Sequence, residues 1–154
     1  MHEKTKKLIR KFKTNDPFLI AEGLNINIRY AKFEDGTRGL YYKVLRQKFI
    51  VLHEDLSEAW KRFICAHEIG HDRLHPGLSR FWLDEHSISN PGKYEREANQ
   101  FAANLLIPDA LLLNGMTIYE AAAVCGVPEE VAHLKQRPQP KRNIWKNEDS
   151  HFSL

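Results

Sequence analysis

Two histidines and a glutamate at helical spacing are the residues of this sequence best suited to chemistry. His67, Glu68 and His71 form an H-E-x-x-H motif. Residues four apart on a helix lie on one face, so the two imidazole rings can bind a single metal ion. Zn²⁺ accepts neutral imidazole nitrogens, and three protein ligands with one open position make a catalytic zinc site. Glu68 would then flank a water at the open position and could take its proton as hydroxide attacks a carbonyl.

The motif lies in a segment whose apolar residues repeat with helical spacing. Chance is the alternative explanation, because 8 His and 13 Glu among 154 residues produce such a match in roughly one chain in thirty. The predicted helix has Ser57 as its N-cap and stops before Pro76. Both histidines interrupt its buried face, where an imidazole without a partner would be costly. The apolar residues that share this face are Leu56, Trp60, Phe63, Ile64 and Leu74.

A zinc site of this kind needs a third protein ligand, and His75 is the first candidate. On a continuous helix His75 lies about 12 Å along the axis from His67, which is too far to share one ion. The metzincin pattern breaks the helix at a Gly three residues after the second His, but this chain has Leu74 there. We therefore predict that His75 only ends the helix, and we keep His86, in a connecting segment, as a secondary candidate.

Helical phase selects the third ligand in the next predicted helix, residues 93–107. Glu95 lies within about 40° of Asn99 and Ala102 on that helix, whereas Glu97 points to the opposite side. A carboxylate on the buried face needs a cation, and two histidine ligands need an anionic companion. Glu95 is therefore the predicted third ligand. Asn99, one turn further on, is predicted to accept a hydrogen bond from the other N–H of a ligand imidazole.

These side chains must be positioned by a small α+β domain. Alternating apolar residues predict three strands, and the turn signal at 34–36 predicts a hairpin between the first two. The expected sheet is small, three-stranded and mostly antiparallel, and it packs against a helical core that carries the zinc site. Residues 76–92 are expected to form a long connection. The predicted strands cover about 25–30, 39–44 and 48–53, and the predicted helices about 3–13, 17–22, 58–75, 93–107, 109–114, 117–124 and 128–134.

Two blocks of the sequence resemble the ImmA/IrrE family of metallopeptidases. The first is Ala66-His67-Glu68-Ile69-Gly70-His71 with the following Leu74-His75, and the second, more specific block covers residues 94–108. The likeness extends over roughly residues 15–135. It implies a zinc-dependent fold in which Glu95 is the third ligand and Asn99 lies behind it. Related zinc peptidases often have Asp at the position of Asn99, so the ligands here are expected to be slightly less basic.

The resemblance also implies a function. Members of the family act in bacteria on repressor-type DNA-binding proteins, and the ImmA-like members of mobile elements cleave the element's own repressor to release its genes. A length of 154 residues, without an appended sensor domain, favours this branch. We therefore expect a zinc endopeptidase whose partner is a helix-turn-helix repressor, and whose activity relieves repression of a mobile element such as a prophage, or of a stress regulon.

Composition and charge exclude other classes. With 42% hydrophobic and 28% charged residues, 154 residues are the usual size of one globular domain. No segment reaches the roughly 20 apolar residues of a membrane span, and two cysteines cannot form a secreted disulfide framework, so we expect a cytoplasmic protein. Residues 15–134 carry more acidic than basic side chains, so direct nucleic-acid binding is not expected.

We divide the chain into a basic arm (1–14), a metallopeptidase domain (15–135) and a polar, mobile tail (136–154).

A DNA-binding regulator with a structural zinc is the main alternative. Residues 117–134 predict two short helices around Gly126 and superficially resemble a helix-turn-helix. Glu129 and Glu130 follow the turn with a single lysine after them, which is unfavourable for a helix that faces phosphates. A non-hydrolysing binder, such as one half of a toxin–antitoxin pair, is a third hypothesis. The intact Glu68 argues against it, since a pure binder needs no general base.

Overall fold

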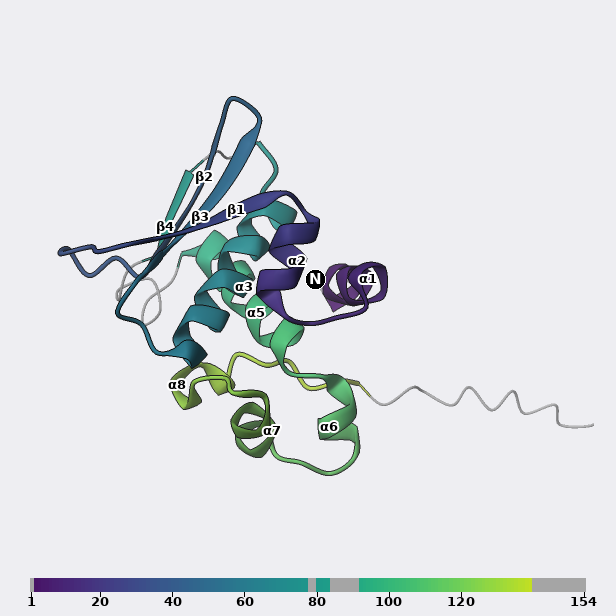
Figure 1. Ribbon diagram of the computed structural model, residues 1–154. Helices are drawn as coiled ribbons and strands as arrows, with labels where there is room; N and C mark the ends of the chain where they lie inside the picture. The colour runs from purple at the N-terminus through teal and green to yellow at the C-terminus, as the bar shows by residue number, and fades with distance from the viewer. Residues whose placement is uncertain (1, 78–79, 84–91, 140–154) are drawn as a thin grey trace, which may run out of the picture.

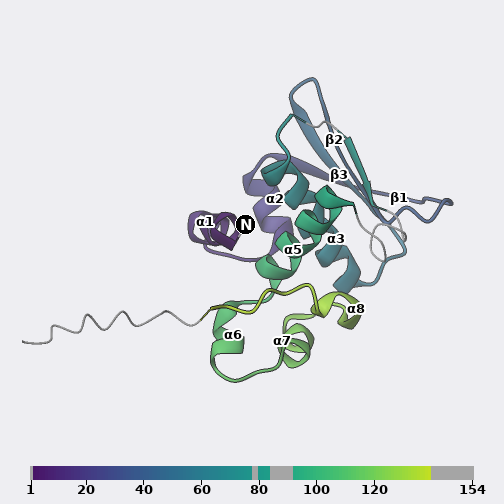
Figure 2. The same cartoon turned by 180° about the vertical axis from the view of Figure 1, so that it is seen from behind.

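A mixed sheet and a group of helices on one side of it make up the fold (Figures 1 and 2). A computed structural model of the chain describes residues 2–77, 80–83 and 92–139. Two long helices, α3 (Glu58–Leu74) and α5 (Lys93–Leu106), pack against each other, and α3 also contacts the sheet. The α+β class expected from the sequence is therefore confirmed.

The sheet has four strands in the described residues, in the order β1-β3-β2-β4. β2 pairs antiparallel with both β3 and β4, whereas β1 pairs parallel with β3. The sheet is therefore mixed, with β1 and β4 at its two edges. The strands are β1 (Ile26–Ala31), β2 (Gly39–Val44), β3 (Gln47–His53) and β4 (Arg80–Leu83).

The sheet differs from the expected one in two respects. The predicted hairpin between the first two strands is wrong, because β1 lies next to β3 and the hairpin joins β2 to β3. Its turn consists of Leu45 and Arg46, both with positive φ (49° and 67°), and neither is a residue that normally signals such a turn. The fourth strand, β4, lies inside the segment expected to be a loop, and it extends the sheet beside β2.

Helix α3 follows the local signals of its sequence. The hydroxyl of Ser57 caps the helix by accepting a hydrogen bond from the backbone N–H of Trp60, as expected for this residue type. All nine residues from 63 to 71 are buried, because the sheet covers one side of the helix and α5 covers another.

Gly70 accounts for the close approach of α3 to α5. A Cβ at this position would lie 3.1 Å from a ring carbon of Phe101 and 3.3 Å from the Cα of Ala98. A side chain there would therefore push the two helices apart. Glycine costs a helix interior about 1 kcal/mol relative to alanine, so its use here reflects packing and not helix propensity.

The remaining helices surround this centre. In α2 (Pro17–Gly23), Asp16 caps the first turn and Pro17 occupies its first position, which both residue types favour. Gly126 adopts a left-handed φ of 66° between two of the later helices, which confirms the predicted turn. No helix in the described part of the chain is both long and apolar enough to cross a bilayer. The other helices are α1 (His2–Phe12), α6 (Asp109–Leu113), α7 (Ile118–Cys125) and α8 (Glu129–Ala132).

Candidate metal centre

His67, His71 and Glu95 lie together in the interior. The two histidines stand one turn apart on α3, are almost fully buried, and have their Nε2 atoms 3.0 Å apart. Glu95 reaches them from α5: its Oε2 lies 3.0 Å from Nε2 of His67 and its Oε1 lies 3.1 Å from Nε2 of His71. The structure thus brings together, from two packed helices, the three side chains that the sequence singled out.

Asn99 determines which nitrogen of His67 carries the hydrogen. The amide oxygen of Asn99 lies 2.8 Å from Nδ1 of His67, and an amide oxygen can only accept. Nδ1 of His67 is therefore the protonated nitrogen of the neutral ring, and Nε2 presents a lone pair toward Glu95. The predicted contact between Asn99 and a ligand imidazole is present in the structure, and it belongs to His67.

The three side chains fit a divalent metal ion. Two imidazole lone pairs and a carboxylate converge at this point, and such a set of acceptors is stable only around a cation. Atoms that bind one ion tetrahedrally at about 2.0–2.1 Å lie about 3.3–3.4 Å from one another. The separations of 3.0–3.1 Å between the side chains are close to this value.

Electrostatics place the ligands in the charge states that metal binding needs. Burial lowers the pKa of His71 to about 4, so its ring is neutral at pH 7. Burial alone would raise the pKa of Glu95, but the contacts of its carboxylate with His67 and His71 outweigh burial and lower the pKa to about 2. The site therefore combines a neutral His71 ring with an ionised Glu95 carboxylate before any ion binds.

Glu68 is the second acidic side chain of the site. It is fully buried, and neither of its carboxylate oxygens has a hydrogen-bond partner in the described part of the structure. Burial raises the pKa of Glu68 well above its ordinary value, and the nearby charge of Glu95 raises it further. A buried carboxylate without a protein partner is positioned to exchange a proton with a bound water or substrate.

Strand β2 packs closely against Glu68 because the strand begins with a glycine, Gly39. A Cβ on Gly39 would lie 2.3 Å from Cγ2 of Ile64 and 3.1 Å from Oε1 of Glu68. The backbone of β2 can therefore approach α3 at the level of Glu68 more closely than any other residue at position 39 would allow.

Two residues that sequence reasoning set aside also belong to this region. His75 is the C-cap of α3, as predicted, but it is also buried, with its Nδ1 3.0 Å from Nδ1 of His71. Its Nε2 lies 2.8 Å from Oε2 of Glu97, which was expected to point away from the site. The spacing of four residues between His71 and His75 was the available signal for their contact.

Among the other histidines considered, His86 lies outside the described residues. The metal-ligating cluster found in the described residues consists of His67, His71 and Glu95, and His75 is not part of it.

A small α+β protein with a two-histidine, one-glutamate centre on packed helices is the class that fold and site define. Residues 21–136 match the peptidase M78 family, described as the IrrE N-terminal-like domain. The chain is 37% identical over 139 residues, 88% of each chain, to "uncharacterized immunity region protein 2" of Bacillus phage phi105. It is 31% identical over 99 residues to "metallopeptidase ImmA" of Bacillus subtilis strain 168, covering 60% of this chain and 57% of the relative. The chain belongs to the ImmA/IrrE family of metallopeptidases.

Proposed function

We propose that this metallopeptidase is a zinc endopeptidase that cleaves a helix-turn-helix repressor and thereby relieves repression of a mobile element. One observation carries the proposal: a buried carboxylate without a partner, Glu68, lies on α3 between two histidines whose rings meet the carboxylate of Glu95. The name of the phage relative, an immunity region protein, supports the repressor as substrate.

The ligand residues have a positioning role in this proposal. His67, His71 and Glu95 would hold the zinc ion, with Asn99 keeping His67 in the correct tautomer. A zinc ion so held would polarise the scissile carbonyl and make a water molecule acidic enough to attack it near neutral pH. One anionic ligand leaves the zinc site with a net positive charge, which suits an electrophilic role.

Glu68 would move the proton. Its carboxylate accepts the proton of the attacking water and then donates it to the amine that leaves when the peptide bond breaks. The raised pKa of Glu68, caused first by burial, makes its carboxylate a stronger base than an exposed one. No other acidic side chain in the described residues combines full burial with two unpartnered oxygens.

The structure weakens the DNA-binding alternative. The second helix of the segment that superficially resembled a helix-turn-helix, α8, has only four residues. Its first turn carries Glu129 and Glu130, both exposed, so the helix presents negative charge to solvent. A recognition helix must reach into a groove lined with phosphates, and α8 is unsuited to that role in length and in charge.

Co-expression of the full chain with the repressor from the same genetic element tests the proposal. We expect the wild type to cleave the repressor, and Glu68→Gln to keep one zinc per chain but to lose cleavage by at least about 100-fold. Glu58→Gln is the matched control, because it makes the same change on the same helix at a side chain that is 85% exposed. Electrophoresis of the repressor and zinc analysis of the purified chain give the result. Cleavage by Glu68→Gln at the wild-type rate would contradict the proposal, as would a zinc-loaded wild type that leaves the repressor intact.

A further inference from the structure

His75 is a buried residue with polar contacts in two directions. On one side its Nδ1 meets Nδ1 of His71 at 3.0 Å, and on the other its Nε2 meets Oε2 of Glu97 at 2.8 Å. The side chain of His75 is 2% exposed, whereas that of Glu97 is 29% exposed. A line of three polar side chains therefore runs from the metal centre to the surface.

The hydrogen positions along this line follow from the ligand role of His71. When Nε2 of His71 presents its lone pair to a metal ion, the neutral ring carries its hydrogen on Nδ1. That hydrogen has Nδ1 of His75 as its acceptor, so the ring of His75 must carry its own hydrogen on Nε2. The carboxylate of Glu97 accepts this second hydrogen. Each N–H then has one acceptor.

We infer that His75 and Glu97 form a positioning pair that holds His71 as a metal ligand. The inference rests on the proposed function, because it assigns a role toward the same metal centre. Histidines that bind metals normally donate their other N–H to a fixed acceptor, which sets the ring orientation and the basicity of the ligand nitrogen. Asn99 is that acceptor for His67, and His75 is that acceptor for His71.

Several contacts hold His75 in place for this role. Its backbone N–H donates to the carbonyl of His71 at 3.0 Å and closes the last turn of α3. The ring of Tyr94 packs against its ring with centroids 4.6 Å apart and an interplanar angle of 63°. Tyr94 and Glu97 belong to the first turns of α5, the helix that also supplies Glu95. One helix thus provides the third ligand and supports the second histidine.

The two acceptors differ in a way that matters for ligand strength. Asn99 offers His67 a neutral amide oxygen, whereas His75 passes the hydrogen bond of His71 on to a carboxylate. A chain of hydrogen bonds that ends on a negative charge polarises the donor ring more strongly than an amide does. His71 is therefore the more strongly supported of the two imidazole ligands.

Two substitutions of His75 separate hydrogen bonding from packing. His75→Phe keeps a ring but removes the acceptor and the donor, whereas the amide of His75→Gln can accept with its oxygen and donate with its nitrogen. We expect His75→Phe to weaken zinc binding by about 10- to 100-fold and His75→Gln to restore it to within about 5-fold of the wild type. His133→Gln, at an exposed histidine, is the control. Competition with a chromophoric chelator, using the full chain and zinc alone, gives the affinity.

A spectroscopic measurement tests the inference independently of folding and of activity. Long-range ¹H–¹⁵N spectra of the zinc-loaded wild type should show His71 protonated at Nδ1 and His75 protonated at Nε2. Zinc affinity of His75→Phe equal to that of the wild type, or His75 protonated at Nδ1, would overturn the inference and leave the proposed function intact. A wild-type chain that binds no zinc would overturn both.

Discussion

At the scale of single residues, Glu68 shows how the site trades stability for function. The surrounding side chains bury it completely and offer neither carboxylate oxygen a hydrogen bond in the described structure. A buried polar group without a partner costs about 1–3 kcal/mol, and an ionised one costs more. We attribute this unfavourable burial to the proposed proton transfer, which needs a carboxylate free of protein partners.

This trade leads to a prediction for the metal-free protein. In the presence of a chelator at pH 7, Glu68→Gln should raise the free energy of unfolding by about 1 kcal/mol, because the burial that raises the pKa of Glu68 opposes folding at this pH and an amide does not titrate. Urea denaturation followed by circular dichroism measures the difference. Glu58→Gln, on the exposed side of α3, should leave the stability unchanged within about 0.5 kcal/mol. A Glu68→Gln protein less stable than the wild type would show that the carboxylate has a stabilising partner.

At the scale of elements, the site depends on how closely α3 is held between β2 and α5. Position 39 is the contact point on the sheet side, and position 70 is the contact point on the helix side. The first contact involves Glu68, and the second lies next to His71, a proposed metal ligand, so the spacing of the layers decides whether the proposed catalytic groups meet.

Gly39→Ala is predicted to separate catalysis from metal binding. The three heavy atoms nearest to the added methyl group belong to Ile64, Glu68 and Val51, and not to a proposed metal ligand. Overpacking of this kind costs about 1–3 kcal/mol. We expect a loss of stability in that range, a fall in cleavage of at least about 10-fold, and a zinc content equal to that of the wild type. Gly92→Ala is the control, because no atom of the described residues lies within 4 Å of a Cβ there. Wild-type cleavage by Gly39→Ala would mean that the base tolerates a shift of β2.

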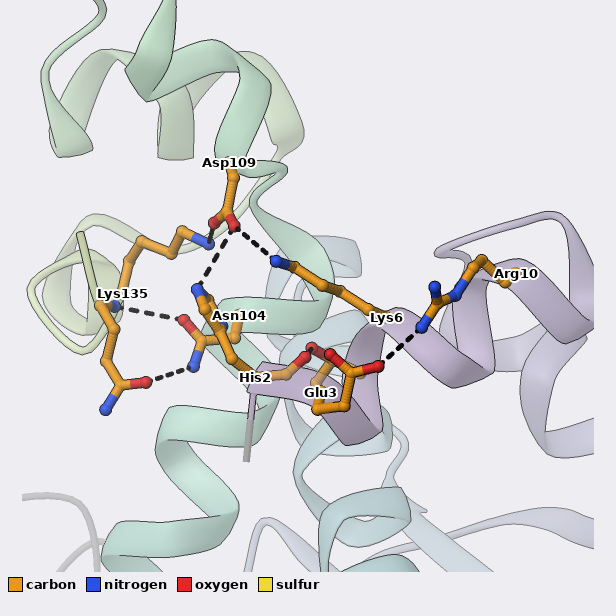
Figure 3. Close-up of polar contacts among 9 residues, drawn as sticks. His2, Glu3, Lys6, Arg10, Asn104, Asp109 and Lys135 are labelled. Atoms are coloured by element: carbon orange, nitrogen blue, oxygen red, sulfur yellow. Dashed lines mark hydrogen bonds and ion pairs between the residues drawn. The ribbon is translucent and has the colours of Figure 1, made fainter. Parts of the chain in front are cut away.

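At the scale of the whole molecule, Asp109 connects parts of the chain that are far apart in sequence. Nζ of Lys135 lies 2.5 Å from Oδ1 of Asp109, and the side chains of His2 and Lys6 in α1 lie 3.3 Å and 3.8 Å from Oδ2 (Figure 3). The side chain of Lys135 is fully buried, while that of Asp109 is 19% exposed. The start of α6 thus holds the N-terminal helix and the segment after α8.

This connection also bears on the domain boundaries at residues 14 and 135, which stay a prediction. Leu8 of α1 belongs to the main core cluster, and α1 contacts α5. Within the described residues, therefore, α1 packs against the predicted metallopeptidase domain. Residues 140–154, the larger part of the predicted mobile tail, lie outside the described residues.

Asp109→Asn is predicted to be strongly destabilising. The substitution leaves the buried ammonium of Lys135 without its carboxylate, which should cost about 2–4 kcal/mol, a value below that for a fully buried pair because Asp109 is partly exposed. Lys135→Met removes the buried charge, so the double variant should be more stable than Asp109→Asn alone. Urea denaturation of the wild type, the two single variants and the double variant measures the coupling energy between the two side chains. Additive effects of the two substitutions would contradict the coupling.

The same pair predicts a dependence of stability on pH. Burial alone would raise the pKa of Asp109, but the hydrogen bond and charge of Lys135, with the charges of His2 and Lys6, lower it below the ordinary value. The contribution of Asp109 is therefore complete above the unfolded pKa of about 3.9 and is lost as the pH falls through the lower folded pKa. The stability difference between the wild type and Asp109→Asn should therefore shrink as the pH falls below about 4. An unchanged difference at low pH would contradict this assignment.

Local features of the sequence determined the helices and the choice of site residues. The spacing of His67 and His71, the cap at Ser57 and the phase that separates Glu95 from Glu97 depend on residues within one or two helical turns, where geometry is nearly fixed. Only the tertiary structure decided the parallel pairing of β1 with β3, the addition of β4 and the contact of His75 with Glu97. Each of these joins segments that are distant along the chain, and such contacts depend on how whole layers pack and not on local spacing.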